Sequence, residues 1–187
     1  KKWAKILDVD LTQYAKAYRK KLTCSEIGIT CSAGKTTTKD LLYAILSQRF
    51  NVIKTEQNQN NEIGVPLTIL KADASTDILI VEMAMRHKGE IAHLSRIARP
   101  THSIITNIGL THMEQFQTAR DIAKAKAEIF TPALPWQPTP RYAYLNHTTP
   151  FYELLKKRAE RYAYTIYPFC GTDKPDQNLN LCYQIAS

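Results

Sequence analysis

A Gly34-Lys35-Thr36 tripeptide is the first segment of the chain whose residue types and order suit chemistry. It directly follows Glu26–Thr30, which is typical of a short strand, and it opens Lys35–Phe50, whose apolar periodicity predicts a helix. Backbone N–H groups at a helix start bind phosphate, a lysine adds a point charge, and a following hydroxyl can bind Mg²⁺. The general phosphate-loop pattern requires a glycine where Ile29 stands, and so short a tripeptide also occurs in accidental turns. Its position between a strand and a helix favours a nucleotide-phosphate site.

Polar side chains also follow two apolar segments that we predict to be strands. Glu82 ends the continuous apolar run Ile78–Glu82, and Asn107 follows the segment His102–Thr106, with His112 a few residues later. Ligands of open α/β sheets bind at the carboxyl ends of the strands, so these groups would lie near the phosphate-binding tripeptide. For Glu82 alone, a strand-end carboxylate that faces water is the alternative. The occurrence of such groups at three strand ends favours one shared site.

Lys126 is a third candidate because of its position on a predicted helix, Ala119–Phe130. The apolar positions Ile122, Ala125 and Ile129 mark the buried face of that helix, and Lys126 points along the same stripe. A lysine on an inward stripe usually extends its ammonium group to the surface. Periodicity alone therefore favours a structural role over a functional one.

The elements that must position these residues alternate between strand and helix. Further strands are expected at Val52–Lys54 and Tyr142–Leu145, and further helices at Val65–Ala72, Gly89–Ala98 and Pro150–Arg161. This alternation predicts an α/β fold with a mainly parallel sheet and helices on both faces. Shorter strand-like pieces at Tyr162–Tyr167 and Leu179–Ile185 predict a small strand-rich C-terminal piece.

Bulk composition excludes several classes of protein. The 187 residues suffice for one domain, and a hydrophobic content of 44% with 22% charged residues is ordinary for a globular protein. No apolar run is long enough to span a membrane, and no signal peptide is visible. The four cysteines form no CxxC pair, which favours reduced thiols in a cytoplasmic protein and excludes zinc fingers.

The formal charge of +8 is concentrated near the start of the chain. Residues 1–22 hold seven basic and two acidic side chains and are expected to form a helical lead-in to the domain at 23–187. A basic helix of this kind can contact nucleic acid or a membrane surface. Because no aromatic interleaving or nucleic-acid motif accompanies it, we expect a solvated face and no nucleic-acid partner. A basic chain also suits the handling of nucleotide phosphates and an anionic substrate.

Taken together, several segments resemble the central domain of the Mur ligases, a family with a P-loop NTPase-like central fold. The similar segments follow one another in the order and spacing of that family and are Thr30–Thr38, Lys54–Pro66, Glu82–Met85, Gly89–Ile91, Thr106–His112 and Ala123–Phe130. Within the family, Asn60-Asn-Glu-Ile-Gly-Val-Pro66 is most similar to the MurF type. The resemblance implies an ATP-dependent ligase of peptidoglycan precursor synthesis. Its reaction adds D-alanyl-D-alanine to UDP-MurNAc-tripeptide through an acyl phosphate.

The resemblance also implies roles for individual residues. Lys35 would bind the β and γ phosphates of ATP, Thr36 and Glu82 one Mg²⁺, and His112 a second Mg²⁺. Lys126 would be carbamylated and so become an anion that assists metal binding. The other nucleotide-binding residues would be Ser32, Ala33, Gly34, Thr37 and Asn107. Asn60 and Asn61 would line the substrate cleft.

The sequence departs from the family pattern at four positions. Cys31, Gln57 and Ala84 replace common glycines, and Ala33 replaces a frequent asparagine. If such glycines had positive φ, each replacement would cost about 1–2 kcal/mol and would weaken ATP binding. A degenerate, non-catalytic nucleotide-binding domain is therefore one alternative function. A Mur or folylpolyglutamate-type ligase acting on another substrate is a second.

The length of the chain gives the last expectation. The family's N-terminal domain for the UDP substrate and its C-terminal domain are absent from these 187 residues. We therefore expect an incomplete central domain, monomeric, and inactive without the other domains.

Overall fold

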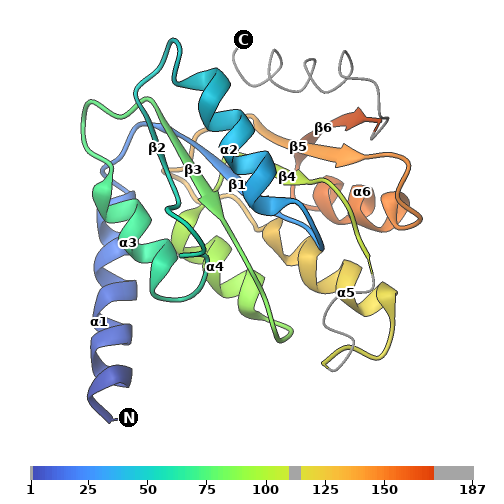
Figure 1. Ribbon diagram of the computed structural model, residues 1–187, viewed down its shortest axis with the longest axis horizontal. Coiled ribbons are helices and arrows are strands. Elements are labelled where there is room, and N and C mark those ends of the chain that lie inside the picture. Colours follow the sequence, from blue (N-terminus) through green and yellow to red (C-terminus); the bar gives the residue numbers. More distant parts are fainter. Residues whose placement is uncertain (1, 110–114, 171–187) are drawn as a thin grey trace.

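A six-stranded sheet forms the centre of the computed structural model, which describes residues 2–109 and 115–170. The strand order is β2-β3-β1-β4-β5-β6, and every neighbouring pair is parallel. The strands are β1 (Ser25–Thr30), β2 (Val52–Lys54), β3 (Ile78–Glu82), β4 (His102–Ile105), β5 (Arg141–Asn146) and β6 (Tyr164–Phe169). Because all of them run in one direction, their carboxyl ends meet along one edge of the sheet (Figure 1).

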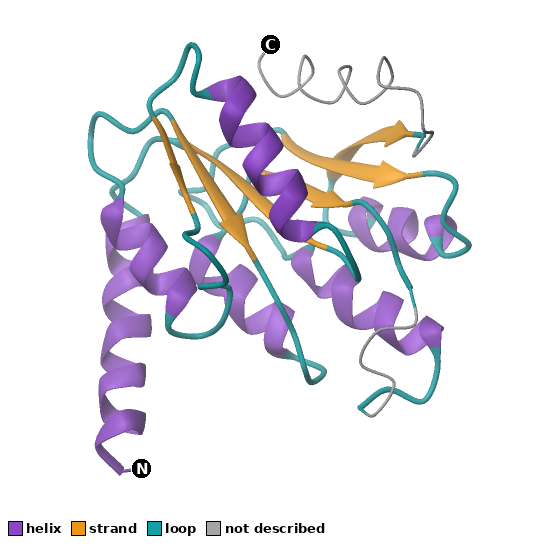
Figure 2. Ribbon diagram, in the orientation of Figure 1, coloured by secondary structure: helices purple, strands orange, loops and turns teal. Residues whose placement is uncertain are grey.

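Helices cover both faces of this sheet, but unequally (Figures 1 and 2). They are α1 (Lys2–Arg19), α2 (Lys35–Leu46), α3 (Gly64–Lys71), α4 (Glu90–Ala98), α5 (Ala119–Lys126) and α6 (Tyr152–Glu160), with a 3₁₀ turn, η1 (Ala127–Ile129), after α5. Leu42 and Leu46 of α2 pack on one face, whereas apolar residues of the other five helices share a separate core on the opposite face. No helix in the described ranges is long and apolar enough to cross a membrane.

The central strands are buried on both faces, which explains their continuous apolar sequences. All five residues of β3 are buried, and only Ser25 of β1 is exposed. Side chains of a strand alternate between the two faces, so Ile80 packs on the α2 side while Leu79 and Val81 pack on the other. A strand covered by helices on both sides needs apolar residues at every position. This architecture confirms the predicted α/β fold with a parallel sheet and helices on both faces.

Three predicted boundaries need correction. The first helix after the phosphate loop ends at Leu46 rather than Phe50, because the amides of Gln48 and Arg49 bond three residues back, as in a turn. The helix expected to run to Phe130 becomes the 3₁₀ turn η1 after Lys126. The strand-like piece near Tyr162–Tyr167 is β6, which extends the main sheet instead of forming a separate piece. The piece at Leu179–Ile185 lies outside the described residues.

A buried ion pair attaches α1 to the sheet. Arg19 at the end of α1 is 1% exposed and contacts the carboxylate of Glu26 in β1, which is 0% exposed. Arg19 Nε also donates to the carbonyl oxygen of Ala98 at 3.0 Å, at the end of α4. Burial raises the pKa of Glu26 to about 7, although the guanidinium of Arg19 acts in the opposite direction. The charge of Glu26 thus depends on Arg19 for stabilisation.

We expect Arg19→Met to lower the free energy of unfolding by about 3–5 kcal/mol, since it leaves a carboxyl group buried without its cation. The double variant Arg19→Met/Glu26→Met should recover most of this loss, because well-packed apolar side chains often replace buried ion pairs without cost. Urea denaturation of the wild type, both single variants and the double variant measures the coupling. Equal instability of the double and single variants would contradict the dependence of Glu26 on Arg19.

Candidate nucleotide and metal site

The turn from β1 to α2 has the backbone geometry of a phosphate-binding loop. Gly34 directly precedes α2 and has φ 80° and ψ 12°, the left-handed conformation that glycine adopts without strain. A Cβ built on Gly34 meets nothing within 4 Å, so the requirement for glycine comes from the backbone angle alone. The first N–H groups of α2 have no partner within the helix and are available to an anion at this end.

The replaced glycines do not strain this loop. Among the described residues with a side chain, only Gln57, Arg99 and Ala163 have positive φ, so Cys31, Ala33 and Ala84 do not. The prediction of a backbone penalty is therefore wrong for Cys31 and Ala84. Of the three replaced glycines, only Gln57 has a positive φ, at 46°. Cys31 is buried, and its thiol donates to the carbonyl oxygen of Ala33 at 2.9 Å. Its side chain thus contributes to the shape of the loop.

The segment after β4 forms hydrogen bonds with the phosphate loop. The amide of Asn107 accepts from the backbone N–H of Ala33 at 3.0 Å and donates to the carbonyl oxygen of Ala33, also at 3.0 Å. Ser32 Oγ donates to the carbonyl oxygen of Gly109 at 3.1 Å and accepts from the N–H of Gly109 at 2.8 Å. These paired contacts hold the loop in one conformation through the side chains of Asn107 and Ser32.

Two lysines converge on the carbonyl oxygen of Cys31. Lys35 Nζ donates to it at 3.0 Å, and Lys126 Nζ donates to it at 2.9 Å. Lys126 is 2% exposed, so the expectation that its ammonium group extends to the surface is wrong. Burial, and to a smaller extent the nearby charge of Lys35, lowers the pKa of Lys126 to about 8. A buried amine of this kind is neutral more often than an ordinary lysine.

Glu82 lies at the centre of a second group of contacts, beside the start of α2. Its carboxylate is 1% exposed, accepts from Thr36 Oγ1 at 3.1 Å on Oε2, and accepts from Asn60 Nδ2 at 2.8 Å on Oε1. Lys39 Nζ lies 3.8 Å from Oε2. The alternative of a carboxylate that faces water is therefore wrong, and the structure brings Glu82 and Thr36 together.

The donor set at Thr36 and Glu82 fits a magnesium ion. Mg²⁺ prefers oxygen ligands and commonly binds one or two carboxylates together with phosphate oxygens and water. The hydroxyl of Thr36, on the first turn of α2, and the carboxylate of Glu82, at the end of β3, match that preference. Within residues 2–109 and 115–170, no group of three or more His, Cys, Asp or Glu side chains forms an all-protein metal cage. The phosphate of a nucleotide would have to complete the coordination.

The remaining predicted residues have separate surroundings. Asn61 Oδ1 accepts from the backbone N–H of Gly64 at 2.9 Å, so it caps the start of α3. Thr37 is exposed on the first turn of α2. His112 lies outside the described residues. Gly28 does not belong to the phosphate loop, because it lies within β1, where an added Cβ would come within 3.0 Å of Pro100.

A cleft of about 790 Å³ opens beside these groups. Its lining includes Lys35, Asn60, Asn61 and Ala84, together with the exposed basic residues Arg86 and Lys88. Two carboxylates, Glu62 and Glu90, also line the cleft, so its three cations exceed its anions by one, and this small excess favours anionic ligands. Both asparagines predicted to line a substrate cleft thus border the same cavity as Lys35.

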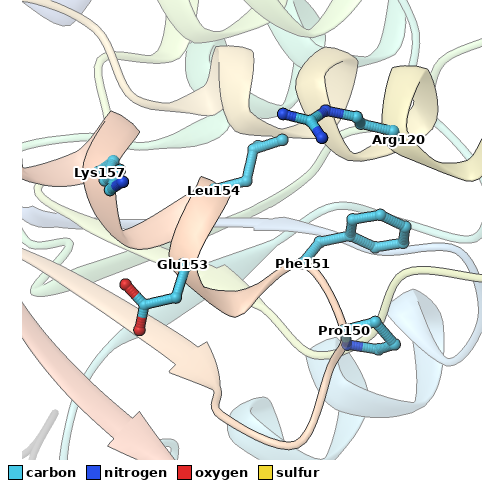
Figure 3. A pocket seen from close by; sticks show the side chains of 6 residues that line it. All are labelled: Arg120, Pro150, Phe151, Glu153, Leu154 and Lys157. Atoms are coloured by element: carbon cyan, nitrogen blue, oxygen red, sulfur yellow. The ribbon is translucent and has the colours of Figure 1, made fainter.

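A second, smaller pocket of about 420 Å³ lies between α5 and α6 (Figure 3). The apolar side chains of Phe151 and Leu154 lie across from Arg120 (Figure 3). It shares no lining residue with the first cleft, and none of the predicted site residues borders it. Of these two cavities, the one beside the phosphate loop is the one that predicted site residues line.

Lys39 is the member of this site that sequence reasoning missed. It is 1% exposed and lies in α2 on the same stripe as the buried Leu42 and Leu46. It also follows Thr36 by three residues, which places the two side chains on neighbouring positions of the helix. The sequence signal that could have identified Lys39 is its position in line with the apolar residues of α2. The same kind of position singled out Lys126 on its own helix.

The fold and this loop define the chain first as a phosphate-loop α/β domain, and comparisons with known proteins identify the family. Residues 29–182 match the model of the Mur ligase middle domain. The chain therefore belongs to the Mur ligase family, and the matched region corresponds to its middle domain.

Individual relatives agree with this assignment. The UDP-N-acetylmuramoyl-tripeptide–D-alanyl-D-alanine ligase of Bacillus subtilis is 50% identical over 119 residues, which cover 64% of this chain and 26% of that protein. The crystal structure of MurF from Acinetobacter baumannii superposes with a TM-score of 0.80 at 31% identity, covering 87% of this chain and 35% of that one. MurF from Thermotoga maritima in complex with ADP gives 0.70 at 34% identity, covering 87% and 36%. The chain thus spans only about a third or less of the proteins that it matches.

The backbone angles separate two kinds of substitution in the loop. We expect Gly34→Ala to weaken ADP binding by up to about tenfold, since a left-handed alanine costs about 1–2 kcal/mol and 1.4 kcal/mol corresponds to a factor of ten. The affinity falls because the free loop of the variant can relax to relieve this strain, whereas the ADP-bound loop cannot. Cys31→Gly should change ADP affinity by less than about threefold, because Cys31 already has an ordinary φ. Calorimetric titration of the chain and both variants with ADP and Mg²⁺ measures the two effects. A large gain in affinity for Cys31→Gly would instead support a degenerate loop.

Proposed function

We propose that this chain is the ATP-binding part of a ligase that joins D-alanyl-D-alanine to UDP-MurNAc-tripeptide in the cytoplasm. ATP would phosphorylate the terminal carboxylate of the tripeptide, and the amine of D-alanyl-D-alanine would displace phosphate from the acyl phosphate. The single observation that carries the proposal is the contact between Thr36 and Glu82 beside a phosphate loop. The printed name of the Bacillus subtilis relative supports the choice of substrates.

The residues around the loop would stabilise charge on the transferred phosphoryl group. Lys35 would exchange the Cys31 carbonyl for the β and γ phosphates, and the first N–H groups of α2 would bind the same phosphates. Because Asn107 already occupies the N–H of Ala33, its contribution would be to shape the loop and not to bind phosphate directly. Ser32, held by Gly109, would act in the same way. Thr37 is placed one residue further along α2, where it would contact a neighbouring phosphate.

Metal binding would rest on oxygen donors from two elements. Thr36 and Glu82 would hold one Mg²⁺ together with phosphate oxygens, and the ion would neutralise charge on the phosphates. Asn60 would orient the Glu82 carboxylate through Oε1 and leave Oε2 for the ion. His112 would serve a second Mg²⁺, as the family resemblance implies.

The acid substrate would enter the cleft beside Lys35. Arg86 and Lys88 on its rim suit an anionic molecule such as a UDP-linked peptide. The ordinary backbone angles at Cys31, Ala33 and Ala84 disfavour a degenerate domain, although Gln57 does have a left-handed backbone. An acid substrate of another Mur or folylpolyglutamate-type ligase is disfavoured by the 50% identity to the Bacillus subtilis ligase.

The proposal is tested in a chimera in which this chain replaces the matching region of the Bacillus subtilis relative. Lys35→Ala and Glu82→Gln should each lower phosphate release by a factor on the order of 100 or more. The first removes a cation from the phosphates, and the second weakens a ligand of the Mg²⁺ that would neutralise their charge. Phosphate release is measured with both substrates present and with each omitted. Lys124→Met, on the exposed face of α5, is the matched control and should behave as wild type.

Two results would overturn the assignment. One is a chimera that releases phosphate normally with Lys35→Ala or Glu82→Gln. The other is a wild-type chimera that folds and binds ADP but never depends on D-alanyl-D-alanine.

Lys126 is expected to carry a carbamate in the working enzyme. Its amine is buried beside Lys35 and contacts the phosphate loop, so an anion there would offset positive charge at the metal site. With ¹³C-labelled bicarbonate, a carbamate carbon resonance should appear in the wild type and be absent from Lys126→Ala. Lys124→Ala should retain the resonance. A wild-type spectrum without the resonance would leave Lys126 as a loop-binding cation.

A further inference from the structure

Lys39 is a buried cation that borders the candidate metal site without lining the cleft. Its side chain is 2% exposed, and it is absent from the lining of the cavity that contains Lys35 and Asn60. It lies one helical turn after Lys35, on the face of α2 that packs against the sheet. A lysine is rarely buried unless it has partners that offset the cost of desolvation.

The partners of Lys39 come from two different elements. Its Nζ donates to the carbonyl oxygen of Gln57 at 3.1 Å and lies 3.8 Å from Glu82 Oε2. Asp40, also on α2, is 3.7 Å away but half exposed, so its charge is screened by water. Lys39 therefore joins the phosphate-loop helix to the end of β3 and to the segment between β2 and α3.

The segment that Lys39 contacts is the one that carries Asn60. Gln57 has φ 46°, a left-handed conformation that costs free energy for a residue with a side chain. The hydrogen bond from Lys39 stabilises that conformation from within the protein. Three residues later, Asn60 donates to Glu82 Oε1, and its carbonyl oxygen accepts from the N–H of Ala84.

Lys39 thus influences the position of both carboxylate oxygens of Glu82, one directly and the other through the segment that carries Gln57 and Asn60. Oε2 lies near its ammonium group, and Oε1 is bonded to Asn60, whose segment Lys39 holds at Gln57. Among the described residues, Lys39 is the one basic side chain within 4.0 Å of this buried carboxylate. A carboxylate that is 1% exposed needs such a charge to remain in place before any metal arrives.

We infer that Lys39 is a positioning residue for the Thr36–Glu82 magnesium site, which it serves by orienting Glu82 and the segment that carries Asn60. The inference rests on the proposed function and adds to it a residue that touches neither nucleotide nor substrate. Side chains that contact the ligands of a metal, but not the metal itself, fix the orientation of those ligands and so affect metal affinity. A lysine this close to Oε2 can also oppose a second cation, so the sign of its effect is itself a test of the inference.

The experiment compares nucleotide binding with and without metal in Lys39→Met, Lys39→Arg and the wild-type chain. We expect Lys39→Met to raise the Mg²⁺ concentration for half-maximal ADP binding by about 10–100-fold, the usual cost of losing an outer partner of a metal ligand. ADP affinity in EDTA should stay within about twofold, because no phosphate-binding group changes. Lys39→Arg keeps the charge and the donor and should restore most of the metal dependence.

Controls separate this role from a general loss of structure. Lys124→Met removes an exposed lysine of α5 and should leave both affinities unchanged. If Lys39→Met does not fold, Lys39→Gln keeps a donor for the Gln57 carbonyl without the charge and allows the same comparison. A purely structural role would weaken ADP binding equally with and without Mg²⁺, and that outcome would overturn the inference.

Two further outcomes are decisive. A Lys39→Met chain that needs less Mg²⁺ than the wild type would show that Lys39 competes with the ion, and this also overturns the inference. A wild-type chain that binds ADP with no dependence on Mg²⁺ would instead overturn the proposed function. The two failures are therefore distinguishable in one set of titrations.

Discussion

The burial of one carboxylate, Glu82, at the end of the central strand β3 is the constraint on which the site depends. An ionised carboxyl group removed from water must find donors and a cation, and here each comes from a different part of the chain. Thr36 and Lys39 reach it from α2, and Asn60 reaches it from the segment before α3. The position of the phosphate-loop helix over the sheet is thus fixed partly by the chemistry that the site requires.

The phosphate loop has a side chain at every position but one. Only Gly34 has a left-handed backbone in this loop, and it remains glycine. The rest of the loop is held by contacts from Asn107, Gly109 and the thiol of Cys31. Side chains that bond the backbone stabilise a single loop conformation, which a more flexible glycine would otherwise have to adopt at an entropic cost.

The unequal distribution of helices has a consequence for the site. Helix α2 packs on one face of the sheet, while five helices pack on the other, and Lys126 reaches the phosphate loop from that opposite side. The loop is therefore contacted by lysines from both layers at one carbonyl oxygen, that of Cys31. Positive charge is concentrated where β1 ends, which is the position at which an open α/β sheet binds its ligand.

The sequence by itself determined the class of fold and most of the candidate residues. Apolar runs such as Ile78–Glu82 and the strand–turn–helix around Gly34 predict a parallel sheet with a phosphate loop, because these patterns depend on local periodicity and backbone angles. Lys39 and the real environment of Lys126 were decided by the tertiary structure, since burial depends on which elements pack over a helix face. The same holds for the phosphate loop after Cys31, whose backbone is held by Asn107 and Gly109, residues distant in sequence. Periodicity gives the direction in which a side chain points, but only packing decides what it meets there.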